Sequence, residues 1–112
     1  MTNGSGANTG ERELQSQALQ ALSEYLELSL DAGASLIVMR HASDTATLYV
    51  GDASAPREEL KRRGTIPAPL ANAILDATRA GMNQLEIDGK TYRFFRSFTH
   101  MDDLAAVVFS ST

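Results

Sequence analysis

The segment QLEIDGKTYRFFRSF, residues 84–98, decides the fold of this chain. Its centre, Asp88-Gly89, favours the positive backbone angles of a type I′ turn, which joins two antiparallel strands through two residues. Such a turn fixes the register, because Ile87 then faces Lys90. The alternation on either side predicts an apolar face made of Leu85, Ile87, Tyr92, Phe94 and, without a bulge, Phe98.

The opposite face of this predicted hairpin carries Glu86 and Arg93, which lie close enough diagonally to pair. Phe95 falls on the same face, where a polar residue is the rule. The aromatic and basic residues together raise the question of base stacking. An RNA-recognition motif needs glycines between its aromatic residues, and they are absent here. We therefore interpret the strand as core, with Phe95 marking a second buried surface.

A second hairpin is predicted from residues 35–40 and 45–50, which are rich in β-branched and aromatic residues and flank a four-residue loop. If Arg40 pairs with Thr45, one face holds Ile37, Met39, Ala46, Leu48 and Val50. The other face then holds Leu36, Val38, Thr47 and Tyr49. Both faces are apolar, so we expect both sides of the sheet to be covered.

Three helices are predicted around these strands. The first runs from Glu11 to Asp31, with Asn8 as its N-cap and Gly33 as its stop, after a flexible tail at residues 1–10. The second spans residues 54–63, where Ser54 can cap the start, glutamates fill the first turn and basic residues the last. The third runs from about Pro69 to Ala80 and ends at Gly81.

The last segment, residues 103–111, is too short for its period to separate a buried strand from a helical turn. Its adjacent valines and phenylalanine favour a strand in the middle of the sheet. The predicted fold is thus α+β, a single antiparallel sheet of about five strands with helices on its faces. The predicted element order is helix-strand-strand-helix-helix-strand-strand-strand.

Composition limits the class of protein. The 112 residues suit one domain, residues 11–112, with 43% hydrophobic and 21% charged residues. Ten Lys and Arg against 14 Asp and Glu give a net charge of −4, so we expect no nucleic-acid or membrane partner. The start MTNGSGANTG lacks the features of a signal peptide, and there is no cysteine, so a cytoplasmic location is expected.

The order of elements resembles the roadblock branch of the profilin-like folds over about residues 11–110. The resemblance is carried by an opening helix, the hairpin LIVMRHASDTATLYVG, a helical crossover and the meander LEIDGKTYRFFRSFTHMDDLAAVVF. It implies a five-stranded antiparallel sheet with helices on both faces. It also implies homodimers that scaffold or regulate nucleotide-switch proteins.

A second resemblance is to small acidic secretion chaperones, which join a long first helix to twisted strands and dimerise. It implies a third strand before the central helix. It also implies that HMDDLAAVV, residues 100–108, starts a helix capped by Asp102. A third interpretation is a small-ligand sensor of the PAS or GAF type, with Met39, Tyr49 and Phe95 lining a pocket.

Residues typical of catalysis are few. His100 with Asp102 and Asp103 offers nitrogen and carboxylate ligands, but alternating residues need not converge on one ion. His41 falls in a loop, and the glycines do not form a phosphate-binding pattern. We expect no enzyme activity, cofactor or metal, and interpret the chain as a homodimeric interaction or regulatory module. The expected partner-binding residues are the basic cluster Arg57, Lys61, Arg62 and Arg63 and the outward-facing Leu36, Val38, Tyr49, Arg93 and Phe95.

Overall fold

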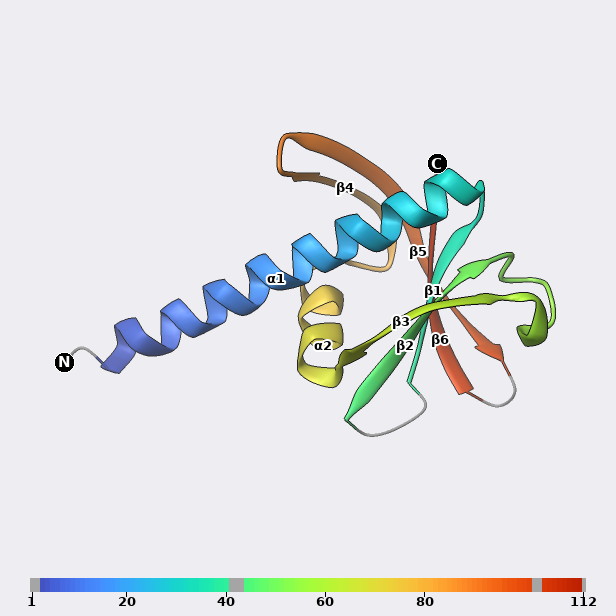
Figure 1. The fold of residues 1–112 in the computed structure, drawn as a ribbon. Helices are drawn as coiled ribbons and strands as arrows, with labels where there is room; N and C mark the ends of the chain where they lie inside the picture. Colours follow the sequence, from blue (N-terminus) through green and yellow to red (C-terminus); the bar gives the residue numbers. More distant parts are fainter. Residues whose placement is uncertain (1–2, 41–43, 102–103, 112) are drawn as a thin grey trace.

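Six strands form one antiparallel sheet in the order β3-β2-β1-β6-β5-β4, and two helices pack on it (Figure 1). The structure, a computed structural model, describes residues 3–40, 44–101 and 104–111, with side chains from Arg12 onward. The elements in chain order are α1 (Asn3–Ala32), β1 (Ser35–Met39), β2 (Thr45–Gly51), the 3-10 turn η1 (Arg57–Glu59), β3 (Lys61–Pro67), α2 (Ala68–Ala77), β4 (Gly81–Ile87), β5 (Lys90–Met101) and β6 (Leu104–Ser111). The predicted α+β class is confirmed, with six strands in place of about five.

Helix α1 begins at Asn3 and not at Glu11, so Asn8 lies within it and is not its N-cap. Its N-terminal half projects beyond the sheet (Figure 1). The predicted start of this helix is wrong. Cap preferences and glycine content predict helix ends only weakly, and the backbone hydrogen bonds of the helix continue through these residues. The stop at Gly33 is confirmed: its φ is 64°, and Ala34 N donates to Ser29 O at 2.9 Å. These are features of a Schellman motif.

Both helices cover the same face of the sheet, whereas the roadblock resemblance implies helices on both faces. Leu22 and Leu26 of α1 and Ile74 of α2 share one apolar core with side chains from all the strands. Phe94 and Phe109 meet at its centre edge to face, with ring centroids 5.5 Å apart. Burial of this cluster is the main source of the stability of the fold.

The other face carries a smaller apolar cluster, and neither α1 nor α2 packs on it. Its members are Ile37, Met39, Leu60, Met101, Ala106 and Val108. Leu60 reaches this face from the segment between β2 and β3 and packs directly on Gly51. A Cβ at residue 51 would lie only 2.6 Å from Cδ2 of Leu60. The prediction that both sides of the first hairpin are covered is therefore confirmed.

The β4–β5 hairpin has the predicted register, with Ile87 opposite Lys90 and Leu85 opposite Tyr92. Asp88 and Gly89 both have positive φ, as a type I′ turn requires. The register of the first hairpin is shifted by one residue, because Arg40 does not pair with Thr45 and Met39 pairs with Thr47 instead. Both faces are apolar there, so alternation could not select the register.

The predicted helix over residues 54–63 is wrong. Only the short turn η1 is helical, and β3 follows it and pairs with β2 along the edge of the sheet. Ser54 does not cap a helix, because its backbone N–H and its hydroxyl both bind Asp52 Oδ1. The basic run fits an edge strand, where charges discourage pairing with other chains. This third strand before α2 is the one that the secretion-chaperone resemblance implies.

The last segment is a strand and lies in the middle of the sheet, as predicted. β6 pairs with β1 on one side and with β5 on the other. Val107 and Phe109 point to the helix-covered face and Val108 to the other, and all three are buried. The helix that the secretion-chaperone resemblance implies is absent over Leu104–Ser111.

Candidate functional site

Two apolar side chains lie opposite each other on the sheet face that neither α1 nor α2 covers, which we call the open face. Met82 of β4 pairs with Phe95 of β5 across the ladder. Met82 is 50% exposed and Phe95 is 43% exposed. Directly paired residues on one face have Cβ atoms about 5 Å apart, so the two side chains form one patch. We call this pair the open-face patch.

A polar pair borders the open-face patch on the side toward the hairpin turn. Arg93 Nε donates a hydrogen bond of 3.1 Å to Gln84 Oε1, its direct partner across the ladder. The sequence predicted a diagonal pair of Arg93 with Glu86. In the structure Arg93 instead binds Gln84, which lies directly opposite it. The open face of this hairpin thus presents an apolar patch next to a fixed cation.

A third exposed apolar residue, Phe98, lies on the helix-covered face of β5. It is 62% exposed, although the hairpin register correctly assigns it to that face. Beside it is a pocket of about 150 Å³ between α2 and the sheet. The pocket is lined by Val38, Arg40, Ala46, Ala71, Asn72, Leu75, Phe98, Ala105 and Val107. Phe98 borders this space and is not enclosed in the core as the sequence predicts.

Arg96 joins β5 to the end of α2. Its Nη1 donates to Leu75 O at 2.9 Å, to Thr78 O at 3.1 Å and to Thr78 Oγ1 at 2.8 Å. Its guanidinium carbon lies 5.6 Å from the centroid of the Phe98 ring. Carbonyl groups at a helix C-terminus carry partial negative charge, so a cation there stabilises the helix. Arg96 is thus a structural residue that holds α2 against the sheet.

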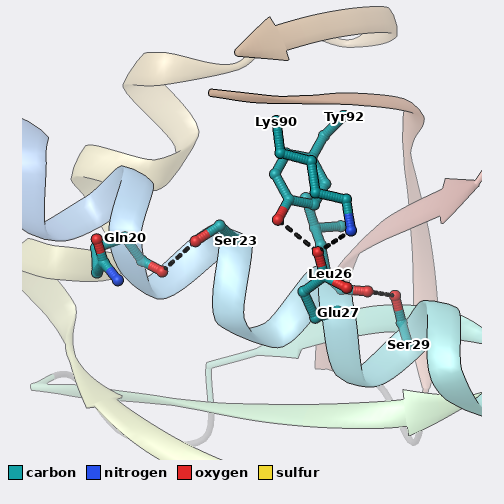
Figure 2. Close-up of polar contacts among 7 residues, drawn as sticks. All are labelled: Gln20, Ser23, Leu26, Glu27, Ser29, Lys90 and Tyr92. Atoms are coloured by element: carbon teal, nitrogen blue, oxygen red, sulfur yellow. Dashed lines mark hydrogen bonds and ion pairs between the residues drawn. The ribbon is translucent and has the colours of Figure 1, made fainter. Parts of the chain in front are cut away.

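Glu27 of α1 connects the helix to the start of β5 (Figure 2). Its Oε2 accepts a hydrogen bond of 2.6 Å from the Tyr92 hydroxyl and forms an ion pair with Lys90. The hydrogen bonds from Lys90 and Tyr92 lower the pKa of Glu27. The hydrogen bond to Glu27, together with burial, raises the pKa of Tyr92 to about 12. The carboxylate of Glu27 therefore holds α1 against β5 and is not a free acid or base.

The structure separates the three apolar residues that the first hairpin was expected to present. Leu36 is fully buried beneath the helices. Val38 is half-buried on the same face and lines the pocket beside Phe98. Tyr49 lies on the other face, half-buried against the smaller apolar cluster. The one-residue change in register accounts for this division, since it moves every side chain of one strand to the other face.

The basic residues lie far from the open-face patch. Lys61, Arg62 and Arg63 are exposed on β3, at the opposite edge of the sheet from β4. Arg57 is half-buried in η1. Of the predicted partner-binding residues, Arg93 and Phe95 lie beside Met82 on β4 and β5, and Tyr49 pairs with Arg62 across the β2–β3 ladder. Sequence reasoning missed Met82, although its position opposite Phe95 follows from the predicted hairpin register.

The pocket expected for a ligand sensor is not formed by the residues assigned to it. Met39 is fully buried in the smaller cluster, and Tyr49 packs against that cluster. Phe95 pairs with Ser110, near the other end of β1, where Leu36 pairs with Phe109. The three side chains are therefore spread along the length of the open face.

Within the described part of the chain, no three His, Asp or Glu side chains are grouped in a way that suits a metal ion. His41, Asp102 and Asp103 lie outside the described residues, so the structure does not place the ligand set proposed around His100. Neither described helix has both the length and the apolar character that crossing a membrane requires. No family model, curated protein or solved structure matches the chain.

Proposed function

We propose that this chain is a non-enzymatic protein-interaction module that forms a homodimer through the open-face patch. The observation that carries the proposal is the pair of Met82 and Phe95, two half-exposed apolar side chains directly opposite each other on the sheet face that neither α1 nor α2 covers. A single exposed apolar residue is ordinary on a protein surface, but adjacent ones are characteristic of a contact surface. On the reverse face of the same strands, Ile87, Tyr92 and Phe94 are buried in the main core, which supports the patch from behind.

A two-fold axis through the patch would bring the two copies together face to face. Such a contact is self-complementary, because Phe95 of one copy meets the same surface on the other. Sheets that pack in this way lie about 10 Å apart and interdigitate their side chains. Aromatic residues at the centre of an interface commonly contribute most of its binding energy.

Sedimentation equilibrium of the whole chain tests this proposal. We expect the unmodified chain to be a dimer, and Phe95→Ser and Met82→Ser each to weaken dimerisation at least about tenfold, which corresponds to about 1.4 kcal/mol. Phe98→Ser is the matched control, because it removes an equally large exposed aromatic residue from the other face of the same strand. An unmodified chain that remains monomeric at the highest measurable concentration would contradict the proposal.

A second candidate function, a chaperone that holds a segment of another protein, has one observation in its favour. The order of α1, three strands and α2 is the order that the resemblance to small acidic secretion chaperones implies. β6 stands where that resemblance implies a helix. Protection of an unfolded client from aggregation, at one client per dimer, would support this function over a purely structural dimer.

A further inference from the structure

The pocket beside Phe98 has an apolar floor made by three neighbouring strands. Val38 of β1 pairs with Val107 of β6, and Val107 pairs with Phe98 of β5. The three side chains form one row on the helix-covered face of the sheet. Helix α2 adds Ala71 and Leu75 to the lining of the same pocket. A group that enters this pocket therefore lies between a helix and a sheet and meets apolar atoms on both sides.

The volume of the pocket suits one aromatic ring. It is about 150 Å³, and its lining includes the methyl groups of Ala46 and Ala105. An apolar cavity of about this volume is large enough to admit benzene. Binding sites for small molecules are lined mainly by hydrophobic side chains, with a few polar groups that fix the orientation of the ligand. The pocket has the first of these features along its floor and walls.

The exposure of the lining residues gives the pocket an inner wall and a rim. The inner wall is formed by Ala46, Ala71 and Val107, which are buried. A ligand that enters from the rim would place its apolar end against this wall and keep its polar end near solvent. The lining residues exposed at the rim are Arg40, Asn72, Phe98 and Ala105.

The polar groups of the rim come from Arg40 and Asn72. Arg40 Nη1 donates a hydrogen bond of 3.4 Å to Asn72 Oδ1, so a guanidinium that follows β1 lies beside an amide on α2. A guanidinium carries a positive charge and a fork of N–H donors that matches a carboxylate, and an asparagine amide has two further N–H donors. The rim is thus complementary in charge and in hydrogen bonding to a carboxylate.

We propose that the pocket beside Phe98 binds a small aromatic carboxylate. The ring of the ligand lies against the inner wall, and its carboxylate accepts hydrogen bonds from Arg40 and Asn72. Aromatic rings pack favourably edge to face or offset against one another, so the exposed ring of Phe98 favours an aromatic ligand over an aliphatic one. This inference goes beyond the proposed dimer and does not rest on it, because Met82 and Phe95 lie on the open face.

Titration of the whole chain with sodium benzoate tests this proposal. The methyl signals of Ala71 and Ala105 are followed by nuclear magnetic resonance, because both residues line the pocket. Benzamide is the control for charge, since it has nearly the same shape as benzoate and is neutral. Acetate is the control for the ring, since it carries the carboxylate alone. Circular dichroism confirms that each variant folds.

We expect benzoate to shift both methyl signals until they saturate, and benzamide and acetate each to bind at least about tenfold more weakly. Arg40→Gln is expected to weaken benzoate binding at least about tenfold and to leave benzamide binding unchanged. Arg63→Gln is the matched control, because it removes an exposed arginine on β3 and is expected to leave both affinities unchanged. Ala105→Leu is expected to abolish binding of benzoate, because the larger side chain fills the pocket.

The proposal would be overturned if benzoate, up to its solubility limit, gave no saturable shift at Ala71 and Ala105. Equal affinities for benzoate and benzamide would also overturn it, because the charge of Arg40 would then play no part. Equal affinities for benzoate and acetate would do the same, because the pocket would then hold no ring. Phe95→Ser is expected to leave benzoate binding unchanged, so failure of this site is distinguishable from failure of the dimer proposed above.

Discussion

Gly64 of β3 lies against the phenol ring of Tyr25 on α1, so closely that a side chain at residue 64 would have no room. A Cβ there would be 2.1 Å from Tyr25 Oη and 3.1 Å from Cζ. We expect Gly64→Ala to lower the free energy of unfolding by about 1–3 kcal/mol, because the ring must shift to admit the methyl group. Chemical denaturation measures this change.

The double variant Gly64→Ala with Tyr25→Phe separates this steric effect from any other. Removal of the hydroxyl eliminates the shortest contact, so the double variant is expected to recover most of the stability lost in the single one. Tyr25→Phe alone provides the reference for a double-mutant cycle. Strictly additive effects would show that Gly64 and Tyr25 do not touch in solution.

Leu60 is expected to be the main cover of the smaller apolar cluster on the open face. It is buried there with Met39 and Val108, although it comes from an irregular segment. We expect Leu60→Ala to lower the free energy of unfolding by about 2–4 kcal/mol, as for other buried leucines. Glu59→Ala, one residue earlier and exposed, is expected to change it by less than about 0.5 kcal/mol. Similar effects of the two variants in thermal denaturation would argue against a folded segment here.

Arg96 is expected to be irreplaceable by lysine. Its guanidinium reaches two backbone carbonyls and a hydroxyl at the end of α2 while lying near the ring of Phe98. Arg96→Met is expected to destabilise the chain by about 1.5–3 kcal/mol through loss of charge-assisted hydrogen bonds. Arg96→Lys should recover less than half of this loss, since lysine has no planar group to lie near the ring of Phe98. Full recovery by lysine in urea denaturation would mean that charge alone matters.

The contact of Glu27 with Tyr92 predicts a dependence on pH at both ends of the scale. The pKa of Glu27 is lowered by its hydrogen bonds from Lys90 and Tyr92, so its contribution to stability is present above the ordinary carboxyl pKa and is lost as the pH falls through the lowered value. The pKa of Tyr92 is raised to about 12, so its contribution is present below about 10 and is lost as the pH rises through about 12.

Ultraviolet titration of the phenolate groups checks this prediction. We expect one tyrosine to ionise near pH 12, and this titration to disappear in Tyr92→Phe. Glu27→Gln is expected to shift it back toward the ordinary tyrosine pKa, because the carboxylate no longer disfavours the phenolate. A titration curve that Glu27→Gln leaves unchanged would contradict the contact shown in Figure 2.

Local chemistry made part of the fold predictable from the sequence. Asp88-Gly89 prescribes the turn, and the turn prescribes the register of β4 and β5 down to single pairs. Gly33 likewise determines the end of α1. In these places a few neighbouring residues decide the structure, and no distant partner is needed.

Elsewhere the structure depends on distant contacts. Lys61, Arg62 and Arg63 satisfy the rules for a helix end, but the segment gains more by pairing with β2 and by placing Leu60 on the open face. Both faces of the hairpin of β1 and β2 carry apolar residues. This pattern predicts that both faces are covered, but it does not determine which of the two registers the strands adopt. Tertiary contacts then made the choice.

The candidate site shows the same division. Phe95 was identified from its face alone, because a phenylalanine on the polar side of a hairpin breaks a local rule. Met82 could have been found by extending the register from the turn to its opposite partner.

The position of β6 also determines when the domain can be completed. It is translated after every other described element, yet it lies between β1 and β5. Until it emerges from the ribosome, the first three strands and the β4–β5 hairpin have no shared ladder, and the edge of β1 is open to other chains. Folding therefore waits for long-range pairing, which is slow and exposes apolar strands. A nascent chain of this protein is most vulnerable to aggregation in the moments before β6 is made.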